Sequence, residues 1–160
     1  MVYRVYLIIN KLLQIIAGII LIGLILLVCG NIFFRVFLFP IRGTFELVGL
    51  LGAVMCGFSL AYTQDQGANI AVDILFKHFS KSIRKALSII NHFVCIFLFS
   101  IGTWKLVLWA IDISKSGEVT ETLRIIYYPF ILCVAFGFFL LVISFMLSLF
   151  MLFKSTDLDY

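Results

Sequence analysis

Charged residues are scarce in this chain: Asp, Glu, Lys and Arg make up only 12% of its 160 residues, whereas 64% are hydrophobic. Soluble domains carry about 25% charged residues. A water-soluble domain of this length has too little interior to hide so many apolar side chains. The shortage of charge therefore excludes the soluble, disordered and small secreted classes and indicates an integral membrane protein.

Residue types that build redox, metal and catalytic sites are also few. The four cysteines (Cys29, Cys56, Cys95 and Cys133) stand alone in apolar runs, which argues against a disulfide framework or a zinc site. A haem between helices needs facing histidines, and both histidines lie toward one side of the membrane. No glycine-rich phosphate loop, nucleophile elbow or HExxH motif occurs. We therefore predict no catalytic, cofactor or metal site in this chain.

Four apolar runs predict four transmembrane helices. Between flanking charges they enclose 23, 18, 19 and 29 residues. At ~1.5 Å of rise per residue, each run is long enough to cross a hydrocarbon core of ~30 Å. We predict an all-α membrane protein in a single domain of residues 1–160, with spans at about 12–38, 44–64, 86–111 and 125–153.

The link between the second and third spans has a helical pattern of its own. In residues 70–85, apolar side chains recur at i, i+3, i+4, i+7 and i+11, and charged ones take the other face. A basic amphipathic helix of this kind lies in the membrane interface. It would serve as a lipid anchor or brace, or simply as an ordered crossing between spans. Its candidate lipid or brace residues are Asp73, Lys77, Lys81, Arg84 and Lys85.

Basic residues are distributed unevenly between the two sides of the predicted membrane. Seven lie on the side of both termini and four on the other, with Lys105 inside the third span left out. The positive-inside rule then places both termini in the cytoplasm, and it explains the basic residues near span ends without a nucleic-acid partner.

Two patterns point to helix contacts. Arg35 and Glu46 are 11 residues apart across a short turn, and Asn31 lies one turn below Arg35, so a pairing within or between chains is expected unless headgroups solvate both charges. In the second span, small residues recur at spacing four behind Glu46, which permits close helix approach. Packing inside the chain and docking onto another membrane protein both explain that stripe. The partner-interface candidates are Asn31, Arg35, Glu46, Gly49, Ala53, Gly57 and Ala61.

Short motifs over residues 15–150 resemble one family, the small membrane subunit of tripartite ATP-independent periplasmic (TRAP) transporters. They are Phe33-Phe34-Arg35 closing the first span, Glu46 opening the second, residues 69–73 (NIAVD) after it, and residues 123–129 (LRIIYYP) entering the fourth. The family usually has histidine where Asn69 stands, often an acidic pair at Glu46, and commonly a proline and a tryptophan entering the fourth span. These departures bear on the substrate subtype.

The resemblance implies an accessory subunit of the bacterial inner membrane that packs against a large membrane subunit. The large subunit would hold the sodium ions and an organic acid, sialic acid or a dicarboxylate, which a periplasmic binding protein delivers. Membrane lipids would be the remaining partner. The candidates for touching the binding protein are Lys115, Glu118, Glu121 and Arg124.

Two other functions compete with this one. A self-associating small multidrug-type exporter would carry a membrane-embedded carboxylate in its first span, which has none. A membrane redox or haem subunit would need the ligands that the chain is short of.

Overall fold

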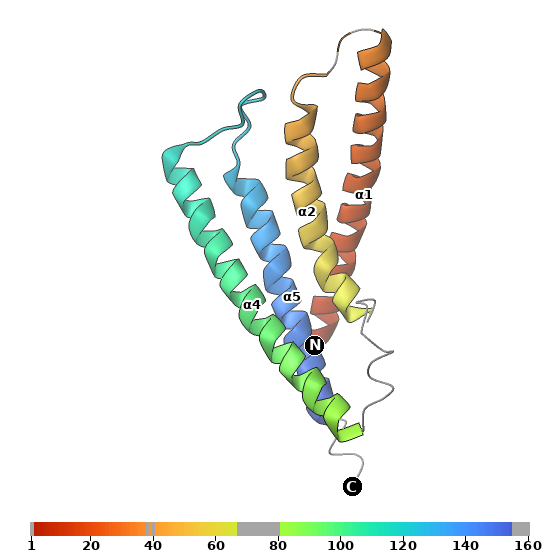
Figure 1. The fold of residues 1–160 in the computed structure, drawn as a ribbon, viewed down its shortest axis with the longest axis vertical. Helices are drawn as coiled ribbons and strands as arrows, with labels where there is room; N and C mark the ends of the chain where they lie inside the picture. The colour runs from red at the N-terminus through yellow and green to blue at the C-terminus, as the bar shows by residue number, and fades with distance from the viewer. Residues whose placement is uncertain (1, 38, 40, 67–80, 155–160) are drawn as a thin grey trace.

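A computed structural model describes residues 2–37, 39, 41–66 and 81–154. It contains the four long helices that the sequence predicts: α1 (Val2–Phe37), α2 (Thr44–Asp65), α4 (Lys81–Ser116) and α5 (Tyr128–Lys154). Each is long and apolar enough to cross a membrane. They alternate in direction, so α1 begins and α5 ends at the same end of the molecule (Figure 1). We call this the terminal end and the opposite one the distal end.

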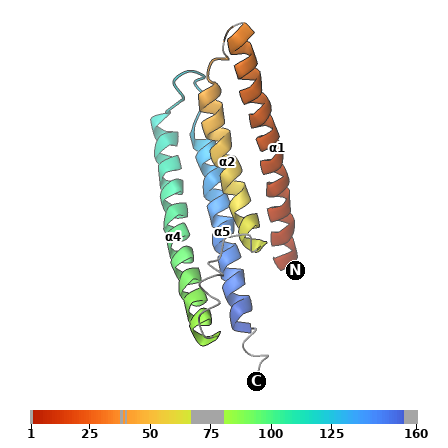
Figure 2. The same ribbon diagram turned by 45° about the vertical axis from the view of Figure 1, so that its right-hand side comes forward.

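The helices lie side by side in the order α1, α2, α5, α4 (Figures 1 and 2). The packed neighbours are α1 with α2, α2 with α5, and α5 with α4. The two inner helices are accordingly more buried. Of the residues in an apolar stretch of 18 residues in each helix, 28% are buried in α2 and 44% in α5, against 11% in α1 and 6% in α4. The chain is therefore an open row with two edge helices that expose apolar side chains along their length.

Helix ends follow local chemistry. α5 starts at Tyr128 with Pro129 as its second residue, where the missing N–H costs no helical hydrogen bond. α2 starts after Gly43, whose φ of 76° favours glycine. α1 starts at Val2, ten residues before the predicted span, and its Tyr6 and Ile9 join a cluster with Ala61 of α2 and side chains of α5.

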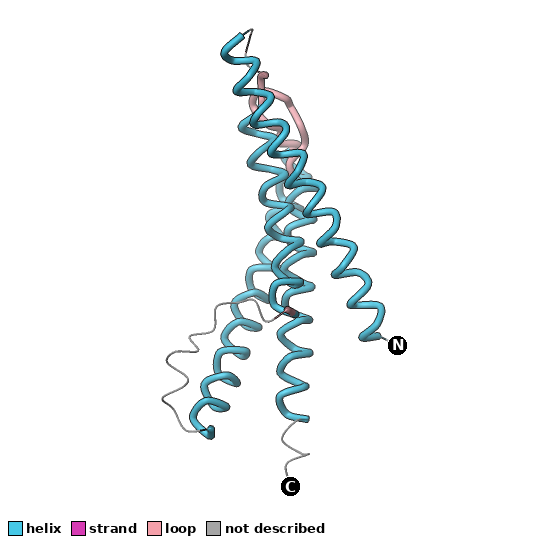
Figure 3. Tube along the Cα trace, turned by 90° about the vertical axis from the view of Figure 1, so that its right-hand side faces the viewer, coloured by secondary structure: helices cyan, strands magenta, loops and turns pink. Residues whose placement is uncertain are grey.

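The core divides into three clusters along the row. The largest lies toward the terminal end, where buried Tyr6, Ala61, Leu140, Leu141 and Phe145 meet partly buried side chains of all four helices. A middle cluster joins α1, α2 and α5, and a third joins α4 to α5 alone near the distal end. Seen from its edge, the row spreads toward the terminal end, with α1 diverging from the others (Figure 3).

The predicted amphipathic helix at about 70–85 falls mostly outside the described residues, and so do Asp73 and Lys77. Lys81, Arg84 and Lys85 lie in the first turns of α4.

Candidate functional site

The two inner helices contact each other closely through glycine. A Cβ atom added at Gly137 of α5 would lie 2.2 Å from the carbonyl oxygen of Gly57 on α2. A Cβ added at Gly57 would lie 3.2 Å from the Cα atom of Val134. Backbone therefore packs on backbone here, the arrangement that small residues permit between helices in lipid.

The small-residue stripe of α2 divides between two surroundings. Gly57 and Ala61 are buried against α5, so they serve the packing of this chain rather than an outer surface. Gly49 and Ala53, further toward the distal end, are exposed. Only this exposed half of the stripe is open to a partner.

One carboxylate joins three helices toward the terminal end. Asp65, in the last turn of α2, accepts hydrogen bonds from the Tyr6 hydroxyl at 2.9 and 3.0 Å and from the Asn10 amide at 2.5 Å. The Ser144 hydroxyl of α5 also donates to it. Asn10 and Ser144 are 1% and 0% exposed, so these donors reach Asp65 from the packed interior. We call these four residues the Asp65 junction.

The chemistry of the Asp65 junction is that of an anion held by neutral donors. A carboxylate at the C-terminus of a helix faces the negative end of the helix dipole, which is unfavourable. Three donors from α1 and α5 offset that cost, and hydrogen bonds to a charged acceptor are stronger than neutral ones. The junction therefore fixes the edge helix α1 to both inner helices.

Sequence reasoning missed the Asp65 junction and treated Asp65 only as the end of a span. The available signal was the placement of Asn10 and Ser144, polar residues within otherwise apolar stretches. A buried polar side chain in a membrane helix needs a partner, so each of them should have prompted a search for one.

A second carboxylate ties α2 to the α4–α5 loop at the distal end. The two carboxylate oxygens of Glu46 accept hydrogen bonds from the backbone N–H groups of Thr122 at 2.7 Å and Leu123 at 3.1 Å. The loop itself is closed by a bridge between Val119 and Ile126 and by the hydrogen bonds of buried Thr120. The Thr120 N–H donates to the carbonyl oxygen of Ile125, and the Thr120 Oγ1 and carbonyl oxygen accept from the N–H groups of Ile125 and Arg124. We call Glu46, Thr120, Thr122 and Leu123 the Glu46 clasp.

Leu123 also covers the start of α2. A Cβ added at Gly43 would lie 2.3 Å from Leu123 Cγ, so only glycine leaves room for this side chain. Gly43, Gly117 and Arg124 all have positive φ, and Arg124 is the one non-glycine residue among them. The turn at Gly43 before α2 and the turns at Gly117 and Arg124 in the α4–α5 loop thus bring this loop onto the N-terminus of α2.

The expected pairing of Glu46 with Arg35 is not what the structure shows. Within the described ranges Glu46 bonds the α4–α5 loop, and no ion pair joins it to Arg35. Asn31 instead accepts a hydrogen bond from the backbone N–H of Ile41 at 2.8 Å and so fastens the α1–α2 connection to α1. Loop backbone satisfies the carboxylate because the folded loop reaches it, while Arg35 stays exposed.

The remaining candidates lie on surfaces. Lys115, Glu118, Glu121 and Arg124 are all exposed at the distal end, where a soluble partner can reach them. Among the described residues, no group of three His, Cys, Asp or Glu side chains could hold a metal ion.

Hydroxyl groups within the spans bond their own helices. Ser59, Thr63 and Thr103 donate to carbonyl oxygens three or four residues earlier. The buried polar side chains of the described part lie in the Asp65 junction, in the Glu46 clasp or at the start of α2. They are Asn10, Ser144, Thr120 and Thr44. The arrangement binds helices together; it does not line a polar route through the described spans.

Comparison with known families identifies a matching family model. The family described as "Tripartite ATP-independent periplasmic transporters, DctQ component" matches residues 24–155, which is most of the chain. The curated proteins and the solved structures that were compared gave no match.

Proposed function

The chain belongs to the DctQ component family of TRAP transporters, and we propose that it is an accessory subunit that widens the static part of the transporter and carries no solute itself. A transport component with four membrane helices suits this role because the buried polar side chains of its described spans bond other parts of this chain, and Asn10 Oδ1 is the one buried polar atom among them that lacks a partner there. Polar residues at membrane depth mark solute and ion pathways in transporters. The observation that carries the proposal is that the Asp65 junction and the Glu46 clasp both bond parts of this chain to one another.

The open row supports a partner beside it. Edge helices α1 and α4 expose large apolar side chains along both flanks, including Ile19, Leu26, Phe97 and Trp104. A large membrane subunit covering part of this surface would bury it against protein, while lipid covers the rest. The exposed small residues Gly49 and Ala53 would allow a partner helix to approach α2 closely.

The rest of the system follows from the family. We propose that the large subunit binds the sodium ions and an organic acid, with sialic acid or a dicarboxylate as the substrate classes. A periplasmic binding protein would deliver that acid, and the exposed loop residues Glu118, Glu121 and Arg124 are the surface that this chain offers it. The bias of basic residues toward the terminal end supports cytoplasmic termini in the bacterial inner membrane.

Reconstitution tests this role directly. Proteoliposomes should take up the organic acid when they contain the large subunit and this chain and receive the binding protein under a sodium gradient. Vesicles with this chain alone, or with this chain and the binding protein, should show none. Uptake by the chain alone would overturn the accessory role and favour a self-sufficient exporter-like function.

A further inference from the structure

Two polar contacts mark depth along the α1–α2 pair. Asn10 of α1 meets Asp65 of α2 at the terminal end, and Asn31 of α1 bonds Ile41 just before α2 at the distal end. From Asp65 to Glu46, α2 rises 19 residues, or about 29 Å at 1.5 Å per residue. That length matches a hydrocarbon core of about 30 Å, and we infer that the core lies between these two levels.

The end of α1 continues past the distal boundary. Residues 32–37 lie beyond Asn31 and add about 9 Å of helix. Together with residues 39 and 41–45 they form what we call the α1–α2 tip. The headgroup layer on each side of the core is about 5–8 Å thick, so the tip occupies its depth. The polar α4–α5 loop, held at Glu46, marks the same boundary.

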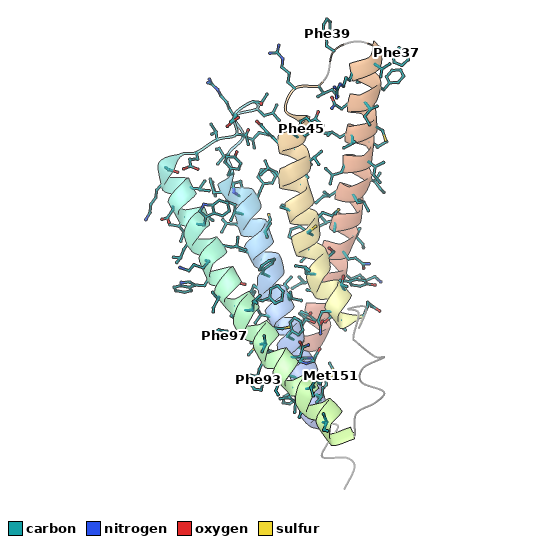
Figure 4. The ribbon with its side chains drawn as sticks, in the orientation of Figure 1. Phe37, Phe39, Phe45, Phe93, Phe97 and Met151 are labelled. Atoms are coloured by element: carbon teal, nitrogen blue, oxygen red, sulfur yellow. The ribbon has the colours of Figure 1, made fainter. Side chains whose placement is uncertain are left out.

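The tip combines exposed aromatic rings with exposed positive charge. Phe37, Phe39 and Phe45 are 68%, 84% and 91% exposed, and Figure 4 shows Phe37 at the end of α1, Phe39 in the connection beyond it and Phe45 at the start of α2. Arg35 and Arg42 are exposed too, and no acidic residue occurs between residues 12 and 45. Along the chain the nearest carboxylate is Glu46, which accepts hydrogen bonds from the α4–α5 loop.

We propose that the α1–α2 tip is a binding site for anionic phospholipid, with Arg35 and Arg42 holding the lipid phosphate. Guanidinium groups bind phosphate oxygens through paired hydrogen bonds. Phe45, next to Glu46, lies at the inner edge of the headgroup layer beside the acyl chains, and Phe37 and Phe39 lie further out among the headgroups. A free phosphate ion would leave those rings in water, so the geometry favours a lipid. This site is independent of the proposed transport role.

Lipid exchange on the purified full chain tests the charge part of the proposal. Native mass spectrometry would measure how much phosphatidylglycerol each protein retains in competition with phosphatidylcholine. Each basic side chain near an anionic surface contributes about a fivefold preference. The preference of the double variant Arg35→Gln/Arg42→Gln for phosphatidylglycerol over phosphatidylcholine should therefore be at least fivefold lower than that of the wild type.

The matched control changes two basic residues at the same end of the molecule, Lys115→Gln/Arg124→Gln. It should keep the wild-type preference, because these residues lie on the α4 end and the polar loop. Equal retention by the wild type and the tip variant would overturn the proposal, and so would equal losses in both variants. Displacement of the lipid by inorganic phosphate at matched concentration would show a free-anion site and overturn the choice of lipid.

The depth of the tip is tested separately by fluorescence. In a Trp104→Phe/Trp109→Phe background, Phe39→Trp supplies one indole at the tip of the vesicle-reconstituted chain. Lipids with a quencher near the headgroup should quench it more than lipids with a quencher at the acyl terminus. Quenching by aqueous iodide alone would place the tip in water and overturn the proposal. Loss of lipid quenching when the large subunit is added would show that protein covers the tip, with the same consequence.

Discussion

Replacing Gly137 with alanine tests how the inner helices are held together. The added methyl group would lie 2.2 Å from the Gly57 carbonyl oxygen and 2.4 Å from its carbonyl carbon. Both are backbone atoms, so no side-chain rotation relieves the contact and α2 must move away from α5. Overpacking of a tight core costs about 1–3 kcal/mol of unfolding free energy. We expect Gly137→Ala to reach the upper part of that range.

A thiol-reactive dye can follow this change in the full chain in detergent. Cys95 and Cys133 are partly buried, so their labelling during heating reports the separation of the helices. Gly137→Ala should lower the temperature at which labelling rises. Gly18→Ala is the matched control, because nothing lies within 4 Å of a Cβ at that position of α1. Alanine favours helix over glycine by about 0.5–1 kcal/mol, so this control should be neutral or stabilising. A Gly137→Ala protein as stable as the wild type would refute the backbone contact.

Three further changes probe the two ends of the row. Asp65→Asn brings an amide N–H group against the donors of Asn10 and Ser144. The loss of these hydrogen bonds should lower the free energy of unfolding by about 1–3 kcal/mol, which the same labelling assay would follow. Unchanged stability would show that the Asp65 junction does not hold α1. Glu46→Gln should release the loop at Thr122 from α2 and so raise its cleavage by an added protease, whereas cleavage equal to wild type would exclude a clasp. Gly43→Ala should destabilise the fold because alanine is strained at the positive φ of this position and because its methyl group would clash with Leu123. Adding Leu123→Ala removes the clash and should recover only part of the lost stability. Full recovery would show that the positive φ carries no cost.

The helices could be predicted from sequence because each span is a continuous apolar run bounded by charges. A helix in lipid must satisfy its own backbone hydrogen bonds, so the length of the run nearly determines the element. The order of the helices in the row could not be predicted. Small residues on α2 indicated a close neighbour, but only the structure identifies Gly137 on α5 as that neighbour.

The polar contacts were harder to predict because they depend on which distant residues meet. The short separation of Glu46 and Arg35 in sequence predicts that they pair within or between chains, whereas the bonds that Glu46 makes within this chain go to Thr122 and Leu123, which lie 76 and 77 residues away. Asp65 and Ser144 are 79 residues apart. Partners so far apart along the chain are set by helix order, which local patterns do not encode.

Gentle purification of the chain from its native membrane tests the accessory role most directly. The tagged full-length protein would be extracted in a mild detergent, and the proteins that elute with it would be identified and quantified by mass spectrometry. The account predicts a large polytopic membrane protein of the TRAP type in near-equal amount. Elution of the chain alone, or as a species made only of copies of itself, would contradict it.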